Sequence, residues 1–176
     1  LIRGGLVYDG SPGAPRACDV LIRGDRIAKV APGISEPAAH EVDARGCVVC
    51  PGFVDIHRHL DARPFTDWRG EAELRQGITT AVAGNCGFSL APMVALTDQL
   101  RAHLEPILGL LPEAVPAGFP GYLRALDRAA KPLNLAAMVG TGSVRIAVKG
   151  FAAGRWTAEE MAEIEASMRE DDRGEY

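Results

Sequence analysis

The sequence lacks the patterns that mark membrane, nucleic-acid-binding and disulfide-rich proteins. It has no run of about 18 apolar residues that could span a membrane, and no apolar leader at its start. It has no basic stretch that could follow a phosphate backbone, and its formal net charge is −4, so we expect neither a membrane nor a nucleic-acid partner. Its four Cys are too few for a disulfide scaffold and favour a reducing, cytoplasmic location.

What is present is typical of a folded globular chain. Hydrophobic residues make up 47% and charged residues 24% of the 176 positions, which argues against disorder. The chain is too short for a complete (β/α)₈ barrel with a further domain, because such a barrel alone takes about 250 residues. Since no Met stands at position 1, we expect at least one residue to precede Leu1.

The first 50 residues predict a small all-β module. Residues 20–23 and 26–30 are apolar and flank Gly24-Asp25, a pair that suits a two-residue hairpin turn. Further strand candidates are residues 6–8 and 40–42. Pro and Gly residues separate these segments, and the character of the sequence changes at Cys50-Pro51-Gly52.

After residue 52 the sequence alternates between strand and helix patterns, which predicts an α/β fold of parallel strands with helical crossovers. Strands are expected at residues 53–59, 78–83 and 133–139, and helices at residues 71–76, 96–111, 122–126 and 157–168. Pro106 should kink its helix or begin a second one, and Thr157 with Glu160 predicts a capping box. The sequence stops where a fourth strand would be needed.

The strongest chemical signal is His57-Arg58-His59 at the end of the first expected parallel strand. Because strand side chains alternate with period two, His57 and His59 should project to one face. Parallel α/β folds build their sites at the carboxyl ends of strands, and two adjacent imidazoles can bind a divalent metal. The alternative is a pair of surface histidines on a loop.

Cys86 follows the second expected strand and lies between glycines that let the backbone approach a ligand closely. A thiolate is a good zinc ligand. Two alternatives stay open: a small buried hydrophobic residue, or a nucleophile activated by a histidine.

Other candidate residues carry weaker signals. Cys47 and Cys50 straddle an apparent strand and should face opposite sides, which argues against a zinc knuckle. Asp55 shares the parity of His57 and could orient a metal ligand or serve as a structural hydrogen-bonding group. Asp61 and Asp67 lie just beyond the strand, and the sequence assigns them no role.

Two stretches resemble a known family. Pro51 to His59, PGFVDIHRH, is similar to the first barrel strand of the amidohydrolase superfamily. Gly77 to Pro92 contains GNCGFSLAP, which resembles a specific signature of the N-acyl-D-amino-acid deacylase (D-aminoacylase) branch. Residues 1–50 are similar to the N-terminal β-sandwich segment of that family. The resemblance covers most of the chain, but only the first part of a typical family member.

The resemblance implies a β-sandwich segment over residues 1–50 and the first part of a (β/α)₈ barrel over residues 51–176, incomplete in this chain. It implies zinc held by His57, His59 and Cys86. It also implies hydrolysis of the amide of a small-molecule N-acyl-D-amino acid by metal-activated water. The general-base Asp and two further His ligands are expected in the missing part of the barrel, so no catalytic residue is identifiable in this chain.

The sequence also departs from the family pattern and leaves alternatives open. Thr141 stands where family members often carry His, and residues 170–176 do not resemble the family continuation. The alternatives are a non-catalytic amidohydrolase-fold scaffold or interaction module, an amidohydrolase acting on cyclic amides, and a metal-free cysteine hydrolase using Cys86. An unclosed sheet leaves its edge unpaired, so we expect an inactive fragment that accompanies the remainder of the barrel, a second chain or a homo-oligomer partner.

Overall fold

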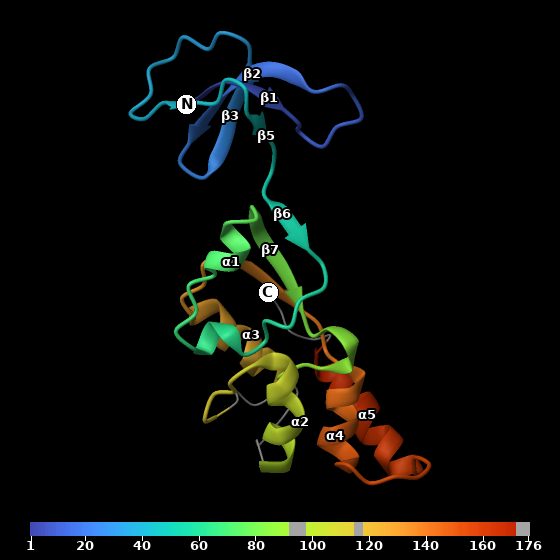
Figure 1. The fold of residues 1–176 in the computed structure, drawn as a ribbon. Coiled ribbons are helices and arrows are strands. Elements are labelled where there is room, and N and C mark those ends of the chain that lie inside the picture. The colour runs from blue at the N-terminus through green and yellow to red at the C-terminus, as the bar shows by residue number, and fades with distance from the viewer. Residues whose placement is uncertain (92–97, 115–117, 172–176) are drawn as a thin grey trace. The chain divides into compact units, whose positions relative to one another are not determined.

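A computed structural model describes residues 1–91, 98–114 and 118–171 of the chain (Figure 1). The chain divides into two compact units, Leu1–Gly52 and Phe53–Tyr176, each of which has its own sheet. The expected mixture of helices and strands is confirmed. Three parts of the sequence analysis lie outside the described residues: Pro92 at the end of the family signature, Leu96 at the start of an expected helix, and residues 172–176.

The N-terminal unit is a five-stranded sheet in the order β3-β2-β1-β4, with β5 also pairing with β1. Its strands are β1 (Ile2–Val7), β2 (Arg16–Arg23), β3 (Arg26–Ala31), β4 (Val42–Asp43) and β5 (Val48–Val49). The expected hairpin is confirmed, because β2 and β3 pair antiparallel across Gly24-Asp25. Gly24 has φ +60°, a left-handed conformation that a primed hairpin turn needs.

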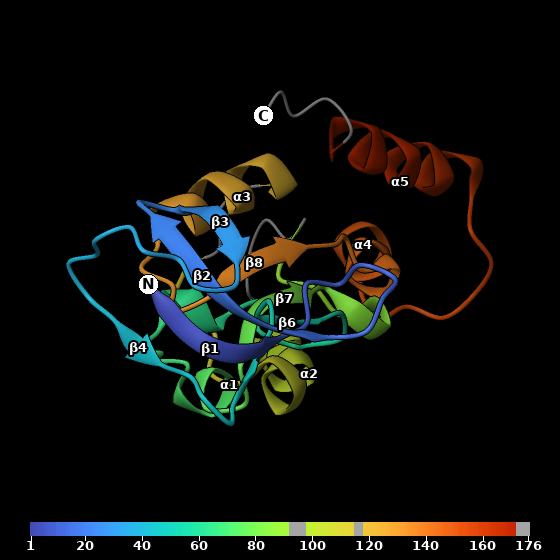
Figure 2. The ribbon, with the colours of Figure 1, turned by 90° about the horizontal axis from the view of Figure 1, so that it is seen from above.

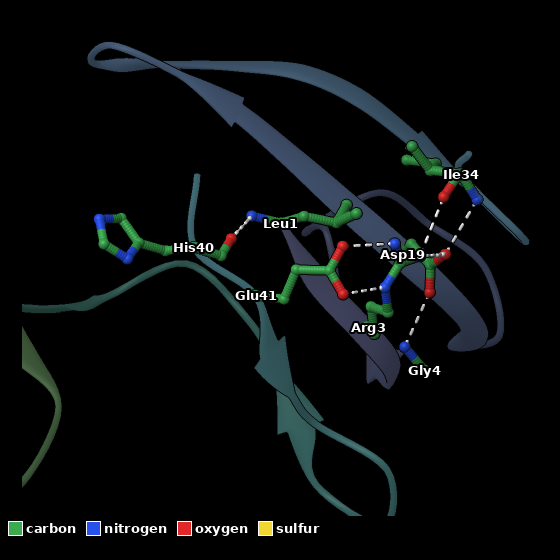
Figure 3. A network of polar contacts seen from close by, with 7 residues as sticks. All are labelled: Leu1, Arg3, Gly4, Asp19, Ile34, His40 and Glu41. Atoms are coloured by element: carbon green, nitrogen blue, oxygen red, sulfur yellow. Dashed lines mark hydrogen bonds and ion pairs between the residues drawn. The ribbon is translucent and has the colours of Figure 1, made fainter. Parts of the chain in front are cut away.

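A buried carboxylate organises this unit (Figure 3). Asp19 on β2 accepts hydrogen bonds from the backbone N–H of Gly4 at 2.8 Å and of Ile34 at 2.9 Å. Arg3 lies 3.5 Å from the same carboxylate and also forms a two-point ion pair with Glu41 at 2.6 and 2.7 Å. One side chain therefore ties β1 and β2 to the segment that follows β3.

Replacing Asp19 by Asn should destabilise the N-terminal unit in a pH-dependent way. The backbone N–H groups of Gly4 and then Ile34 hold the pKa of Asp19 below its ordinary value of 3.8. The ionised carboxylate therefore stabilises the fold above pH 3.8, and this contribution is lost as the pH falls through the folded-state pKa. We expect the difference in melting temperature between wild type and Asp19→Asn to be large at neutral pH and to shrink in acid. An equal difference at both pH values, or the same loss in the exposed control Asp25→Asn, would contradict this role.

The C-terminal unit is built on a parallel sheet in the order β6-β7-β8, and Figure 2 shows β7 between its two neighbours. The strands are β6 (Phe53–Asp55), β7 (Ile78–Ala83) and β8 (Asn134–Ala137). The α-helices are α1 (Glu71–Leu74), α2 (Asp98–Leu108), α3 (Gly118–Arg128), α4 (Thr141–Lys149) and α5 (Ala158–Asp171), and 3₁₀ turns cover η1 (Arg63–Phe65) and η2 (Asn85–Gly87). The expected alternation of strands and helical crossovers is confirmed.

Two expectations about this unit need correction, and a third is narrowed. The first strand ends at Asp55 rather than at residue 59, so both histidines lie beyond it. Helix α4 begins directly after Gly140, in a segment that is not among the expected helices. Of the two outcomes expected at Pro106, a kink or a second helix, the second is excluded, because α2 continues past Pro106 to Leu108. By contrast, the capping box of α5 is confirmed: Thr157 and Glu160 exchange hydrogen bonds of 3.2 and 2.9 Å.

The main core of the C-terminal unit lies where α2 and α3 pack against the segments that follow β6 and β7. Leu104, Leu108, Tyr122 and Leu126 contribute their buried faces, and Leu90 joins them from the segment after β7. The hydroxyl of Tyr122 donates a hydrogen bond of 3.0 Å to the carbonyl of Asp61, just after the histidine pair. The core therefore supports the two segments that carry the candidate ligands.

Within the part of the chain that is described, no helix has both the length and the apolar character needed to cross a bilayer.

Candidate metal centre

His57, His59 and Cys86 come together at the carboxyl ends of β6 and β7. Each offers one ligand atom, and these three atoms lie within 4.8 Å of one another. His57 Nε2 is 3.1 Å from Cys86 Sγ, and the two imidazole rings meet edge to face with centroids 5.7 Å apart. Cys86 and His57 are exposed and His59 is half-buried, so the cluster is open on one side.

The backbone after β6 places the two histidines by hydrogen bonding, not by strand alternation. Asp55 Oδ1 accepts the backbone N–H of His57 at 3.1 Å. The N–H of Arg58 then donates to the carbonyl of Val82 at 3.0 Å, which keeps this segment against the end of β7. The guanidinium of Arg58 forms ion pairs with Glu73 at 2.5 Å and with Asp55 at 3.6 Å. Asp55 therefore orients the histidine segment through the backbone.

Asp61 lies buried between the two ligand-bearing segments. Its carboxylate accepts the backbone N–H of Gly84 at 3.3 Å, and burial raises its pKa to about 6. It does not join the ligand cluster. Asp67 is exposed and lines a cavity of about 660 Å³ that also borders His57 and His59. The structure thus gives Asp61 a bridging position and places Asp67 at the rim of the opening.

Cys86 adopts an unusual backbone conformation. It has φ +57°, and among the described residues it is the only residue other than glycine with a positive φ. Left-handed backbone costs an ordinary L-residue about 1–2 kcal/mol and persists where the surroundings impose it. The neighbours Gly84 and Gly87 have φ +84° and +80°, and a Cβ at Gly84 would overlap the carbonyl oxygen of Met138. The signature glycines therefore let the thiol-bearing loop pack against the end of β8.

The donor set fits a zinc ion. His59 Nδ1 is buried and has no hydrogen-bond partner among the described residues. Burial, followed by the nearby His57, lowers the pKa of His59, which favours the neutral imidazole that ligates metals. Two imidazoles and a thiolate are ligands that zinc prefers. A further ligand from outside these three residues would complete a four-coordinate site.

The remaining candidates lie away from this cluster. Cys47 and Cys50 flank β5 in the N-terminal unit and are exposed free thiols. His103 on α2 is exposed and packs against Phe88 and Phe151 with ring centroids 5.5 and 5.2 Å away. Phe88 also meets the ring of His59 at 6.4 Å, a contact that no sequence pattern indicated.

The three candidate ligands lie in a segment that matches the model of a known protein family. The model of the Amidohydrolase family matches residues 40–172, which include all three candidate ligands. The chain belongs to the amidohydrolase family. A D-aminoacylase of Alcaligenes xylosoxydans xylosoxydans is 41% identical over 154 residues, which cover 84% of this amidohydrolase chain and 30% of that enzyme.

Solved structures also match this chain in fold. An N-acyl-D-glutamate deacylase of Bordetella bronchiseptica, in complex with zinc and a phosphonate inhibitor, superposes with a TM-score of 0.83 at 34% identity. A D-aminoacylase described as having a binuclear metal centre gives the same TM-score at 35% identity. Each match covers 97% of this amidohydrolase chain and 35% of the other chain. The resemblance to the N-terminal portion of the D-aminoacylase branch is therefore confirmed, and the chain spans about a third of the length of the curated relatives it matches.

Proposed function

We propose that the protein containing this chain hydrolyses the amide bond of N-acyl-D-amino acids with a metal-activated water. In this proposal, His57, His59 and Cys86 are metal ligands and zinc is the metal. The observation that carries the proposal is the convergence of three donor atoms within 4.8 Å at the ends of two parallel strands. The names of the relatives support the substrate class.

The proposal includes a fold assignment for the two units. Residues 51–176 would be the first part of a (β/α)₈ barrel, and residues 1–50 would contribute one sheet of a β-sandwich. The order β6-β7-β8 supports this, because neighbouring barrel strands follow one another along the chain, whereas a doubly wound sheet reverses its order at a switch point. Val54 and Ile56 are exposed in this chain, and the remainder of the barrel would pack against them.

The exposed free thiols Cys47 and Cys50 favour a reducing cytoplasm.

Each residue of this chain at the site would have its own role. A bound zinc ion supplies a Lewis acid that polarises the amide carbonyl and lowers the pKa of a bound water to about 7. The imidazole of His59 offers a neutral nitrogen, and Cys86 offers a thiolate whose negative charge offsets part of the cation's charge. Asp55 fixes the approach of His57 through the backbone. The exposed side of the cluster leaves room for the substrate. The Asp that acts as general base would come from outside residues 1–176.

One contact favours a second candidate function. His57 Nε2 is 3.1 Å from Cys86 Sγ, which is the spacing expected for a cysteine nucleophile and its base. Such a pair also needs a group that orients the base, and the nearby Asp55 instead contacts the backbone N–H of His57 and the guanidinium of Arg58. The cysteine mechanism also gives no role to the unpaired nitrogen of His59. The metal site accounts for all three side chains and is therefore preferred.

Removing the metal should abolish activity. We expect the natural protein that contains residues 1–176 to hydrolyse N-acetyl-D-amino acids, to lose turnover with a chelator and to regain it with zinc. The N-acetyl-L-enantiomers and a cyclic amide serve as control substrates and should be turned over poorly. The measurement is amine release alongside metal analysis. Turnover that a chelator does not affect would favour the cysteine nucleophile, and bound zinc without any turnover would favour a scaffold.

A further inference from the structure

Two buried hydroxyl groups join the loop that carries Cys86 to the start of α4. Ser89 and Ser143 are 2% and 1% exposed and lie 54 residues apart. Ser143 Oγ accepts the backbone N–H of Ser89 at 2.9 Å and donates to the carbonyl of the same residue at 2.8 Å. Ser89 Oγ in turn accepts the N–H of Gly140 at 2.9 Å and donates to the carbonyl of Ala91. Both hydroxyls are therefore used for contacts between segments.

The backbones at this contact are unusually close. A Cβ at Gly140 would lie 2.5 Å from the carbonyl oxygen of Gly87, and one at Gly142 would lie 2.8 Å from the same atom. Real Cβ atoms essentially never come within 3.0 Å of such a neighbour. The turn between β8 and α4 is thus shaped to receive the residue that directly follows Cys86.

The loop is also held near its start by Asn85, whose side-chain amide donates hydrogen bonds to the carbonyls of Val82 at 2.8 Å and Arg58 at 3.3 Å. Within residues 84–88, the turn η2 closes on one backbone hydrogen bond, from Phe88 N–H to the carbonyl of Asn85 at 2.9 Å. Asp61 holds the beginning of the loop at Gly84, and the two serines hold its end. The position of the Cys86 sulfur, and with it the left-handed backbone of this residue, is therefore imposed from both sides.

We propose that Ser143 is a positioning residue for the metal ligand Cys86. It acts through Ser89, and it holds the loop so that the sulfur faces the two imidazoles. The proposal rests on the proposed function, since it takes Cys86 to be a ligand. It also gives a physical reason for the Ser in the signature sequence GNCGFSLAP: the serine backbone and hydroxyl dock the loop on α4.

The test uses the natural protein that contains residues 1–176, with cobalt in place of zinc. Bonding of Cys86 to cobalt gives a thiolate-to-metal charge-transfer band in the near ultraviolet. We expect Ser143→Ala to weaken this band and to reduce cobalt affinity about 10- to 100-fold, the range typical of groups that orient metal ligands. Ser143→Thr keeps the hydroxyl and should restore both. Val144→Ala is the matched control, because Val144 is the next buried residue of α4 and lies outside the hydroxyl network.

A second readout does not depend on the metal. In the metal-free protein, the rate of alkylation of Cys86 should change several-fold in Ser143→Ala, since the exposed sulfur leaves its position 3.1 Å from the imidazole of His57. Alkylation of Cys47 and Cys50 in the same sample provides an internal reference. Absence of the charge-transfer band already in the wild type would remove the proposed ligand role of Cys86, while the alkylation rates would still report on its positioning.

Three outcomes would overturn the proposal. In the first, Ser143→Ala keeps the wild-type band, affinity and alkylation rate. In the second, Val144→Ala loses as much as Ser143→Ala, which would make the effect one of helix packing. In the third, Ser143→Ala fails to fold while Ser143→Thr and Val144→Ala fold, which would make Ser143 a structural residue.

Discussion

Replacing Cys86 by Ala should cost the natural protein its tightly bound zinc and, with it, its hydrolytic activity. Groups that only orient a metal ligand are worth about 10- to 100-fold in metal affinity, so loss of a ligand itself should exceed about 100-fold. The thiolate is also the one donor of the cluster that carries a negative charge, so no neighbouring imidazole replaces it. Metal content after dialysis, measured together with turnover of an N-acyl-D-amino acid, gives the result.

The matched control is Cys50→Ala, which removes another exposed free thiol, in the N-terminal unit. We expect this variant to keep both metal and activity. If Cys86→Ala retains normal zinc content and full turnover, Cys86 is not part of the site. If it retains zinc but loses turnover in a protein that chelators do not inhibit, the sulfur acts as a nucleophile.

Replacing Gly84 by Ala should have the largest effect on stability of the substitutions considered. Gly84 has φ +84°, where an L-residue costs about 1–2 kcal/mol, and its new Cβ would overlap the backbone carbonyl of Met138. Rotation of a side chain cannot relieve an overlap with backbone, so the ends of β7 and β8 must separate. We expect a loss of about 3 kcal/mol or more in the free energy of unfolding. Denaturant titration followed by the fluorescence of Trp68 and Trp156 reports on this unit, since both tryptophans lie in it.

Gly150→Ala separates the two causes of this loss. Gly150 has φ +61°, but a Cβ there would meet no atom within 4 Å. With ψ −141°, Gly150 lies outside the left-handed helical region, in a conformation that costs an L-residue about 1–3 kcal/mol, so the control should lose only this conformational part. Equal losses in the two variants would show that the close approach of Gly84 to Met138 contributes nothing.

Local sequence signals predicted much of the fold. The β-branched run Ile78-Thr79-Thr80 lies in a strand with the expected bounds, residues 78–83, and Gly24-Asp25 forms its hairpin turn. These features depend on neighbours in the sequence, so their residue types carry the information. The end of β6 at Asp55 could not be predicted in this way, because it depends on Arg58 pairing with Glu73 and on Asp55 turning to the backbone of His57.

The candidate site was predictable to the extent that topology determines it. Consecutive parallel strands bring their carboxyl ends together, and this alone brings Cys86 close to His57 and His59. Contacts across long stretches of chain leave no periodic signal, so the link between Ser89 and Ser143 could not be foreseen. The helix after Gly140 was missed because a Gly-Thr-Gly sequence favours a loop unless another segment packs against it.

The most direct test of the metal site is X-ray absorption spectroscopy at the zinc edge, on the wild-type protein and on Cys86→Ala. Coordination by two imidazoles and one thiolate predicts nitrogen scatterers at about 2.0–2.1 Å and one sulfur at about 2.3 Å in the wild type. The sulfur shell should be absent in Cys86→Ala. A wild-type spectrum that contains only nitrogen and oxygen scatterers would contradict a shared metal site for His57, His59 and Cys86.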